Sequence, residues 1–270
     1  MKNSPIGVFD SGLGGLTALK QLRQDLPHED FIYFGDTARL PYGGKEREEL
    51  LTLAGTDIAL LESFGVKAIL IACGTVSSVI LPSIQKNYDF PLLGVIESAV
   101  AAAAKATKNR KVGIWATEAS IRSGAYEQGL REQGVGTTVA IPCPKLVPLI
   151  EGGHTDPFDP KVRQAVDEYL EPILKEGCDT LILGCTHFPL LESAIYARAG
   201  KKLHLINVGQ ESARSLKKVL QERELLQESG GSVRYYVSGP KEEFIRMGSR
   251  FMKEELEGKV ESADAEQFRK

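Results

Sequence analysis

Two cysteines hold matching places in this chain. Cys73 closes the apolar run KAILIA at residues 67–72, and Cys185 closes the run TLILG at residues 180–184. Each run is long enough for a strand and too short for a helix, and a new helical pattern follows each one. In open α/β sheets, ligands bind at the carboxyl ends of the strands. Two thiols at such strand ends therefore predict a pair that acts on one substrate from opposite sides.

Two facing thiols can invert a carbon stereocentre without a cofactor. The positive end of a helix dipole favours the thiolate form of a cysteine placed there. One thiolate can remove a proton from a carbon, and a thiol on the opposite face can return one, provided that the site stabilises the carbanion-like transition state. The alternative is that free cysteines are small buried hydrophobes. We expect that simpler role for Cys143 and Cys178, which lack this setting.

Three further residues are candidates to tune the thiols or to relay protons. Asp10 ends the apolar run PIGVFD, Glu151 ends PKLVPLIE beside two glycines, and His187 follows the second cysteine by two positions. Each also has a plain explanation. Asp10 could cap a helix, Glu151 could be surface charge, and His187 could cap the turn after its strand. Neither reading is excluded by the residues alone.

Two glycine-containing loops are candidate ligand sites. Residues 11–15 (SGLGG) follow Asp10 and open a helical pattern, where free backbone N–H groups could hold an anion. The dinucleotide fingerprint is incomplete because Thr17 stands at its third glycine, and no Walker lysine follows. A carboxylate or an amino acid fits the same turn. Residues 41–44 (PYGG) combine a fixed φ with conformational freedom, which suits either a rigid turn with exposed donors or a tight connection.

Strands and helices alternate regularly along the chain, which predicts parallel sheets with helices on both faces. We expect two similar α/β lobes, each a mostly parallel sheet flanked by helices, with the active site in the cleft between them. The first lobe takes residues 1–97 plus 207–270, and the second takes residues 98–206. We also expect one helix over residues 77–88, and a frayed polar tail from residue 258.

Composition narrows the class of function. The chain has 270 residues and a formal net charge of -3, so neither nucleic acid nor an anionic membrane is favoured as a partner. No apolar run approaches the roughly 20 residues of a membrane span. No signal peptide is recognisable, so we expect a cytoplasmic protein with reduced cysteines. No Cys-x-x-Cys pair or histidine cluster predicts a metal site.

Five segments together resemble the glutamate racemases of the aspartate/glutamate racemase superfamily. These segments are FDSGLGG at 9–15, GDTARLPYG at 35–43, ACGT at 72–75, KLVPLIE at 145–151 and GCTHFP at 184–189. The resemblance extends from residue 6 to about residue 254. It implies a two-lobed α/β fold and a cofactor-independent isomerase that interconverts L-glutamate and D-glutamate. It further implies that D-glutamate is supplied for peptidoglycan, and hence for the cell wall and cell shape, and it allows a homodimer.

The resemblance also assigns roles to residues of this sequence. It makes Cys73 the acid/base residue for D-glutamate and Cys185 the one for L-glutamate. Asp10, Glu151 and His187 become the assisting groups. The implied substrate-binding residues are Asp10, Ser11, Pro41, Tyr42, Gly43, Gly74, Thr75, Thr117, Thr186 and His187. Among these, Asp10 and Ser11 are expected near the substrate amino group and reacting carbon, and the PYG turn near a carboxylate.

Two positions depart from the family pattern. Gly74 stands where the family usually has an asparagine that hydrogen-bonds the substrate, and Ser120 stands where threonine is more usual. Losing a hydrogen bond to a charged ligand costs roughly 1.5–3 kcal/mol. The hypothesis is therefore that racemisation survives with weaker substrate binding. Ser120 keeps a hydroxyl, so we expect little effect there.

Two other functions stay open from the sequence. One is a racemase in the same superfamily that acts on aspartate or a related acid, which Gly74 keeps in consideration. The other is a non-catalytic protein that binds an amino acid in the cleft, against which the presence of both cysteines, Asp10 and His187 argues. A pyridoxal-phosphate enzyme would need a lysine for its Schiff base, and no lysine stands at an obvious strand end beside a glycine loop.

Overall fold

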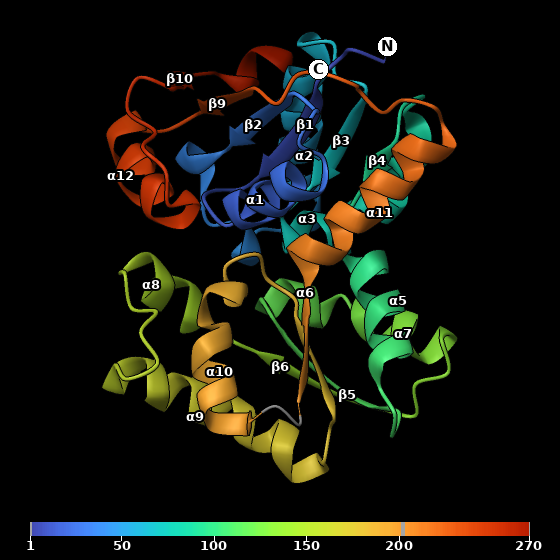
Figure 1. Cartoon of the computed structure of the whole chain (residues 1–270), viewed down its shortest axis with the longest axis vertical. Helices are drawn as coiled ribbons and strands as arrows, with labels where there is room; N and C mark the ends of the chain where they lie inside the picture. Colours follow the sequence, from blue (N-terminus) through green and yellow to red (C-terminus); the bar gives the residue numbers. More distant parts are fainter. Residues whose placement is uncertain (1, 201–202, 270) are drawn as a thin grey trace.

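Two parallel sheets organise the chain, one in each of two stacked lobes (Figure 1). The computed structural model describes residues 2–200 and 203–269. The first sheet has six strands in the order β10-β9-β2-β1-β3-β4. Its strands are β1 (Ile6–Asp10), β2 (Phe31–Gly35), β3 (Ala68–Ile71), β4 (Leu92–Leu93), β9 (Val233–Val237) and β10 (Val260–Ser262). Every neighbouring pair in it runs parallel.

The second sheet has four parallel strands in the order β6-β5-β7-β8. These are β5 (Lys111–Ala116), β6 (Thr137–Pro142), β7 (Thr180–Leu183) and β8 (His204–Asn207). The predicted fold class, two α/β lobes with parallel sheets flanked by helices, is therefore confirmed. The lobe boundaries at residues 97 and 207 stay a prediction. None of the described helices is both long and apolar enough to cross a membrane.

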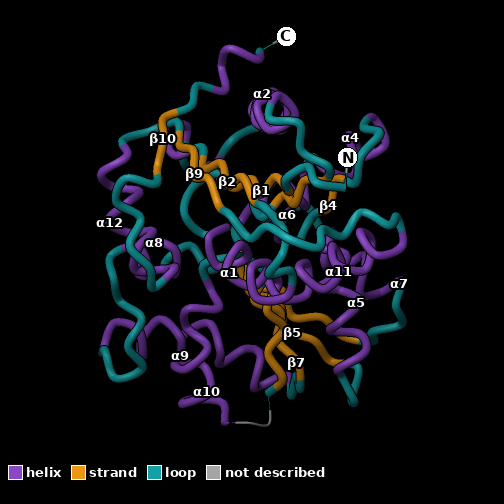
Figure 2. Tube along the Cα trace, turned by 45° about the horizontal axis from the view of Figure 1, so that its top comes forward, coloured by secondary structure: helices purple, strands orange, loops and turns teal. Residues whose placement is uncertain are grey.

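Helices cover both faces of each sheet, as continuous apolar strands require. In the first lobe α1 (Gly15–Asp25) and α12 (Lys241–Met252) cover one face and α2 (Arg47–Ser63) the other. In the second lobe α5 (Ile96–Ala106) and α7 (Ala125–Glu132) share one core, and α9 (Pro160–Glu176) and α10 (Glu192–Ala199) share another. Figure 2 shows strands enclosed by helices in both lobes.

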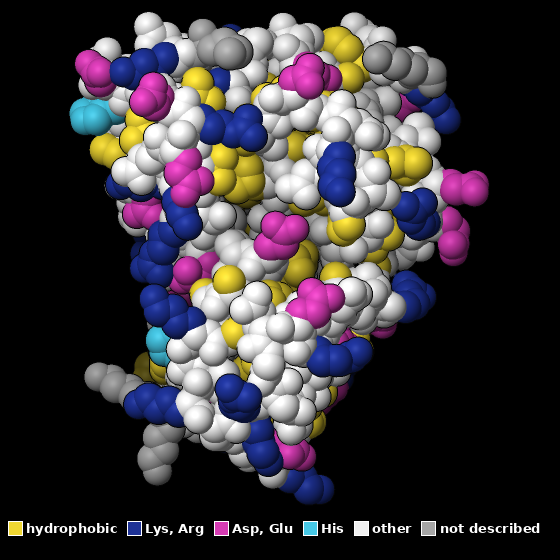
Figure 3. All heavy atoms as spheres, turned by 90° about the vertical axis from the view of Figure 1, so that its right-hand side faces the viewer, with side chains coloured by type: hydrophobic (Ala, Val, Ile, Leu, Met, Phe, Trp, Pro, Cys, Tyr) yellow, Lys and Arg dark blue, Asp and Glu magenta, His cyan; other side chains and the backbone are white. Residues whose placement is uncertain are grey.

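The chain returns from the second lobe to the first through α11 (Val208–Glu222). Asn207 ends β8 and caps this helix, because its side-chain oxygen accepts from the backbone N–H groups of Gly209 and Gln210 at 3.0 and 3.2 Å. Helix α11 packs against α1 and α5, and so it contacts both lobes. On the face shown in Figure 3, acidic and basic side chains are interspersed.

The helix predicted over residues 77–88 is broken, and it begins earlier. The chain forms α3 (Gly74–Val79), α4 (Leu81–Ile84) and the 3-10 turn η3 (Gln85–Asn87) instead. Pro82 lacks the N–H that a continuous helix would need to bond four residues back, so the first helix stops before it. Helix α3 starts directly after Cys73, which places that thiol at the junction of strand and helix.

The prediction of a frayed tail is wrong within the described residues. Residues 260–262 form β10 and pair with β9 at the edge of the first sheet. The 3-10 turn η6 (Ala265–Phe268) then packs against α2. Val260 and Ala265 are the apolar anchors, with 7% and 1% of their surfaces exposed. Two small apolar side chains among polar neighbours gave too weak a local pattern to reveal this packing.

Candidate active site

A cavity of about 430 Å³ lies between the two lobes. Residues from the ends of strands in both sheets line it. All of the candidate residues from the sequence are in its wall: Asp10, Ser11, Pro41, Tyr42, Gly43, Cys73, Gly74, Thr75, Thr117, Glu151, Cys185, Thr186 and His187. The structure thus brings the predicted residues together in one place, although it does not by itself assign their roles.

Strand topology explains this convergence. Asp10 is the last residue of β1, Cys73 follows β3 by two residues, Thr117 comes directly after β5, and Cys185 follows β7 by two residues. All four strands are parallel to their neighbours, so each sheet presents these residues at its carboxyl edge. The two carboxyl edges face each other across the cavity, and Cys73 of the first lobe and Cys185 of the second both line it.

The thiol of Cys185 lies beside a charged histidine. Its Sγ is 3.7 Å from Nδ1 of His187, and Nε2 of the same ring is 3.1 Å from Oε1 of Glu151, the last residue of α8 (Leu146–Glu151). Burial lowers the pKa of His187, but the hydrogen bonds with Cys185 and Glu151 outweigh burial and raise the pKa to about 10. At neutral pH the ring is therefore an imidazolium, and its Nδ1 faces the sulfur of Cys185.

The thiol of Cys73 has a different environment. Its Sγ is 3.5 Å from Oγ of Ser11, and burial together with the charge of Asp10 raises its pKa to about 12. The expectation that a helix N-terminus would favour the thiolate is therefore wrong for this cysteine, because desolvation outweighs the dipole. Asp10 is itself buried, and burial raises its pKa although it accepts from the N–H of Gly12 at 2.8 Å. The two thiols thus lie in different electrostatic surroundings, Cys185 beside a histidine ring and Cys73 beside a carboxyl group.

Hydroxyl groups join the two lobes at one side of the cavity. Thr75 of α3 and Thr117 of the second lobe have their oxygens 3.3 Å apart. The hydroxyl of Thr117 donates to that of Ser120 at 2.9 Å, and the hydroxyl of Ser78 donates to Ser120 at 3.3 Å. Ser120 belongs to α6 (Glu118–Arg122), which packs against α3. This chain of hydroxyls connects the helix after Cys73 to the opposite lobe.

A second bridge between the lobes lies near the other thiol. The hydroxyl of Thr17 donates to the carbonyl oxygen of Thr186 at 2.6 Å. Phe251 of α12 packs against the ring of His187 with the two planes at 90° and the centroids 5.9 Å apart. The glycine-rich turn is equally close, since a Cβ on Gly14 would lie 2.4 Å from Nδ1 of His187. The first lobe therefore touches the Cys185 side of the cavity directly.

The PYG turn forms another part of the cavity wall. Pro41 lies between the 3-10 turns η1 (Thr37–Arg39) and η2 (Tyr42–Gly44), and its peptide bond with Leu40 is cis. The hydroxyl of Tyr42 bonds to Asp36 and Asp57, neither of which lines the cavity. The hydroxyl of Tyr42 thus bonds to protein groups outside the cavity, so a ligand would contact the backbone of the turn.

Sequence reasoning missed several residues of the cavity wall. Cys143 and Glu118 line it, as do the apolar side chains of Pro144, Val147 and Pro148. Cys143 follows β6 directly, so the rule of strand ends could have located it. It is buried, and burial raises the pKa of its thiol, which keeps it neutral. The apolar residues belong to no motif of spaced polar groups and carried no local signal.

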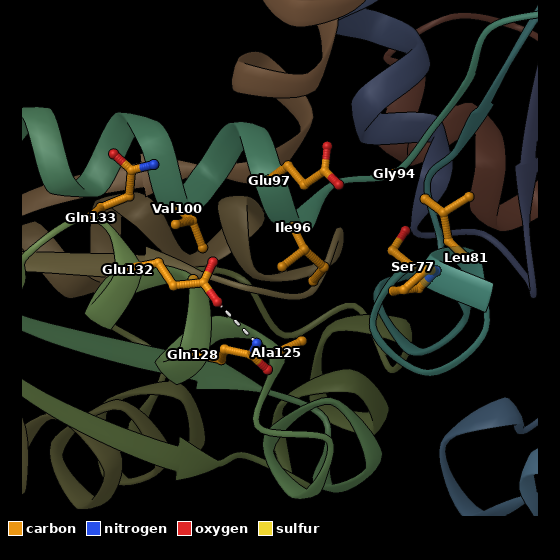
Figure 4. Close-up of a pocket in the computed structure, with 12 residues that line it drawn as sticks. Ser77, Leu81, Gly94, Ile96, Glu97, Val100, Ala125, Gln128, Glu132 and Gln133 are labelled. Atoms are coloured by element: carbon orange, nitrogen blue, oxygen red, sulfur yellow. Dashed lines mark hydrogen bonds between the residues drawn. The ribbon is translucent and has the colours of Figure 1, made fainter. Parts of the chain in front are cut away.

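A second cavity of about 320 Å³ also spans the lobes (Figure 4). It lies between α4, α5 and α7, and its polar wall includes Ser77, Glu97, Gln128 and Glu132. The amide of Gln128 donates to Glu132 at 2.9 Å. None of the candidate residues lines this cavity. Within the described part of the chain, no group of three or more His, Cys, Asp or Glu side chains could hold a metal ion.

Two α/β lobes that bring Cys73 and Cys185 from opposite sides to a shared cavity define a class of enzyme suited to proton transfer at carbon. The sequence model of the Asp/Glu/Hydantoin racemase family matches residues 34–216. The chain belongs to this family, and it is accordingly a racemase, an isomerase that inverts a stereocentre.

Individual relatives agree with that assignment. The chain is 38% identical to glutamate racemase 1 of Caldanaerobacter subterraneus subsp. tengcongensis over 93% of both chains. Glutamate racemase isoform RacE1 of Bacillus anthracis superimposes with a TM-score of 0.93 at 34% identity over 98% of both chains. Glutamate racemase of Francisella tularensis, solved in complex with D-glutamate, superimposes with a TM-score of 0.90 at 34% identity over 99% and 100% of the two chains. The resemblance to glutamate racemases is thereby confirmed.

Proposed function

We propose that this protein interconverts L-glutamate and D-glutamate without a cofactor, with Cys73 and Cys185 as the acid/base pair. The observation that carries the proposal is that Cys73 of the first lobe and Cys185 of the second line a single cavity. The F. tularensis relative binds D-glutamate in its crystal structure, which supports glutamate as the substrate. The product D-glutamate would supply peptidoglycan. A cytoplasmic location and a homodimer stay predictions.

The different surroundings of the two thiols suit the conversion of L-glutamate to D-glutamate. Cys185 as thiolate takes the α-proton of L-glutamate, and the electron pair stays on the α-carbon and is delocalised into the adjacent carboxylate. Cys73, whose raised pKa keeps it a thiol, gives its proton to the opposite face of that carbon. The product is D-glutamate, and the enzyme is left with a protonated Cys185 and a Cys73 thiolate. The reverse direction starts from that second state.

The assisting groups keep the thiols in these states. The imidazolium of His187 faces Cys185, and Glu151 orients and charges the ring from the opposite nitrogen. Asp10 lies in the same cavity beside the Cys73 thiol and is placed to contact the substrate amino group. Ser11 bonds to the Cys73 sulfur and orients it. Both lobes form the wall of the cavity and bury the two thiols, which limits water around the carbanion-like transition state.

The remaining polar groups of the wall bind the substrate. Thr75, Thr117 and Thr186 present hydroxyls or backbone groups from both lobes, and Gly43 presents the backbone of the PYG turn. Gly74 supplies no side chain, so the asparagine contact that is usual in the family is missing here. This gap also keeps a second candidate function in consideration, the racemisation of aspartate or a related acid.

Solvent deuterium incorporation at the α-carbon tests the proposal. Purified protein without added cofactor is incubated in D₂O with L-glutamate and separately with D-glutamate. We expect both isomers to exchange and invert, and we expect Cys73→Ala and Cys185→Ala each to abolish inversion. Exchange with aspartate but not with glutamate would replace the proposal with the second candidate. Binding of glutamate without exchange, and without an effect of either alanine variant, would make the protein a binder only.

A further inference from the structure

A buried cluster of charged and polar side chains lies directly behind the PYG turn. Asp36 follows β2, Arg39 ends η1, Tyr42 opens η2 and Asp57 lies in α2. The side chains of both aspartates are fully buried, and Tyr42 is 1% exposed. Buried carboxyl groups must be paired or protonated. The contacts of each aspartate indicate which of the two it is.

The contacts of Asp36 are those of a carboxylate ion. Its Oδ2 accepts from Nε of Arg39 at 2.7 Å and from the hydroxyl of Tyr42. Its Oδ1 accepts from the hydroxyl of Ser238 at 2.7 Å. Three donors, one of them a guanidinium, bond to this carboxylate and stabilise its charge.

The contacts of Asp57 differ. Its Oδ1 accepts from Nη2 of Arg39 at 2.5 Å, and its Oδ2 lies 2.9 Å from the hydroxyl oxygen of Tyr42. A phenol has one proton, and Tyr42 cannot donate it to both aspartates. Since Asp36 receives it, the contact with Asp57 is a hydrogen bond only if Oδ2 of Asp57 carries a proton and donates it to the phenol oxygen.

Electrostatics agree with this proton count. Burial and the charge of Asp36 raise the pKa of Asp57 well above its usual range, against the opposing effect of Arg39. Burial and both carboxyl groups raise the pKa of Tyr42, so the phenol keeps its proton. Two carboxylates that share one guanidinium and one phenol do not both ionise when they are buried. One proton in addition to that of the phenol therefore belongs to the cluster.

The cluster holds the turn that faces the substrate. Helix α2 contributes no residue to the active-site cavity, whereas η2 lines it and packs against α3 and α6. A Cβ on Gly43 would lie 3.8 Å from Cβ of Thr117 and 4.0 Å from Oγ1 of Thr75, so the turn rests on the pair of hydroxyls that joins the lobes. A shift of Tyr42 would therefore move backbone groups of the cavity wall.

We propose that Asp57 is a positioning residue of the active site, held as a neutral carboxylic acid that donates a hydrogen bond to Tyr42 and thereby fixes the PYG turn. The proposal rests on the proposed function for the identity of the substrate. Asp57 acts through Tyr42 and does not touch the reacting atoms. Its proton serves structure. Asp36 supplies the buried negative charge beside Arg39, and the exposed Glu266 pairs with Nη1 of the same guanidinium at 2.6 Å.

An asymmetric pair of amide variants tests the proposal. In Asp57→Asn the amide N–H replaces the acid proton and the amide oxygen still accepts from Arg39, so we expect KM and kcat to stay within about twofold of wild type. In Asp36→Asn the guanidinium loses its buried anion and keeps only the exposed Glu266, whose Oε1 lies 2.6 Å from Nη1. We therefore expect KM for glutamate to rise roughly tenfold with little change in kcat. Equal damage from both variants, or a tolerated Asp36→Asn with a damaged Asp57→Asn, would overturn the proposal.

Removal of the contact gives the complementary result. Asp57→Ala and Tyr42→Phe each delete the hydrogen bond, and we expect each to raise KM by roughly tenfold while kcat changes less. A purely structural role would lower the midpoint of thermal unfolding without this split between KM and kcat. If Asp57→Ala does not fold, Tyr42→Phe still decides, because it removes only one oxygen atom. An unchanged KM in Tyr42→Phe would contradict the proposal.

Infrared difference spectroscopy tests the proton without any assay of activity. We expect the spectrum of wild type minus Asp57→Asn at neutral pH to contain the C=O stretching band of a protonated carboxylic acid. A band of an ionised carboxylate in its place would overturn the proposal. If wild type fails to racemise glutamate, the proposed function fails, and this spectrum still decides the state of Asp57.

Discussion

A Cβ atom on Gly74 would lie 2.9 Å from the carbonyl oxygen of Gly184, across the boundary between the lobes. The backbone around Gly184 is held firmly, because its N–H donates to the carbonyl oxygen of Trp115 at 2.7 Å and its own carbonyl accepts from Tyr126 at 3.2 Å. The backbone at Gly184 therefore cannot move aside without disturbing its bond to β5. Gly74 therefore lets the two lobes approach at the active site.

The first prediction concerns this approach. We expect Gly74→Ala to lower kcat/KM for glutamate by about tenfold, because the added methyl group pushes the lobes apart and misplaces the thiols relative to the substrate. Gly44→Ala is the matched control, since Gly44 lines the same cavity and an added Cβ there meets no atom within 4 Å. Steady-state kinetics of both variants check this. A Gly74→Ala variant with wild-type kcat/KM would contradict this prediction, because it would show that the lobes accommodate a methyl group at this contact.

The same contact bears on Gly74→Asn. The family resemblance alone suggests that asparagine would strengthen substrate binding through an added hydrogen bond. The structure predicts that this gain is offset by the clash with Gly184, so we expect KM to improve by less than the roughly tenfold that one hydrogen bond to a charged ligand provides. Measurement of KM and kcat for Gly74→Ala and Gly74→Asn side by side separates the two effects. A full tenfold gain in Gly74→Asn would contradict the steric argument.

The second prediction concerns pH. The pKa of His187 in the folded protein is raised to about 10, from a usual value of 6.5. The stabilisation from its charged form is therefore fully present below about pH 6.5 and is lost as the pH rises through about 10. We expect kcat/KM for L-glutamate to fall over the upper part of that range, as the imidazolium beside Cys185 loses its proton. A pH–rate profile and unfolding midpoints from pH 6 to pH 10 measure both effects.

Glu151→Gln is the informative variant for this second prediction. Without the carboxylate, the pKa of His187 falls. Both the decrease of kcat/KM at high pH and the loss of stability at high pH should therefore move to lower pH. His187→Asn should remove the high-pH stability loss altogether. A high-pH limb at the same position in Glu151→Gln as in wild type would mean that another group titrates there.

The third prediction concerns the reactivity of the thiols. A thiolate reacts with iodoacetamide and a thiol does not. Cys185 faces an imidazolium, whereas the pKa of Cys73 is raised to about 12, so we expect Cys185 to be alkylated first. Peptide mass spectrometry over time measures the order, and glutamate should protect by filling the cavity. Cys178 serves as an internal control, because burial raises its pKa to about 11 and it lies outside the cavity.

The fourth prediction concerns stability away from the active site. Lys67 and Glu29 form an ion pair with only 1% of each side chain exposed, and the lysine also donates to two backbone carbonyl groups. Lys67→Ala leaves the carboxylate buried and unpaired, so we expect it to lower the free energy of unfolding by about 3–5 kcal/mol. Glu228→Ala breaks the exposed pair with Lys2 and should change it by less than about 1 kcal/mol. Urea unfolding measures both, and equal effects would contradict the role of burial.

The sequence by itself determined the local features on which the site depends. Short apolar runs that end in Cys73, Cys185 and Asp10 predicted strands with reactive groups at their carboxyl ends, because burial on both faces of a sheet leaves a continuous apolar pattern. Parallel strands bring their carboxyl ends to the same edge of a sheet. The order of strands and helices along the chain therefore predicted where the cavity lies and which residues line it. The motifs that resemble the family contain these strand-end residues, and so they predicted the family as well.

Only the tertiary structure decided how groups far apart in the chain pair with one another. The contact of His187 with Glu151, the bonds of Tyr42 to Asp57 and the approach of Gly74 to Gly184 each join separate elements. Local pattern carries no information on such pairs, because their geometry depends on how whole lobes and helices pack. The raised pKa of Cys73 is decided the same way: the dipole that favours a thiolate is local, and the burial that outweighs it is set by packing.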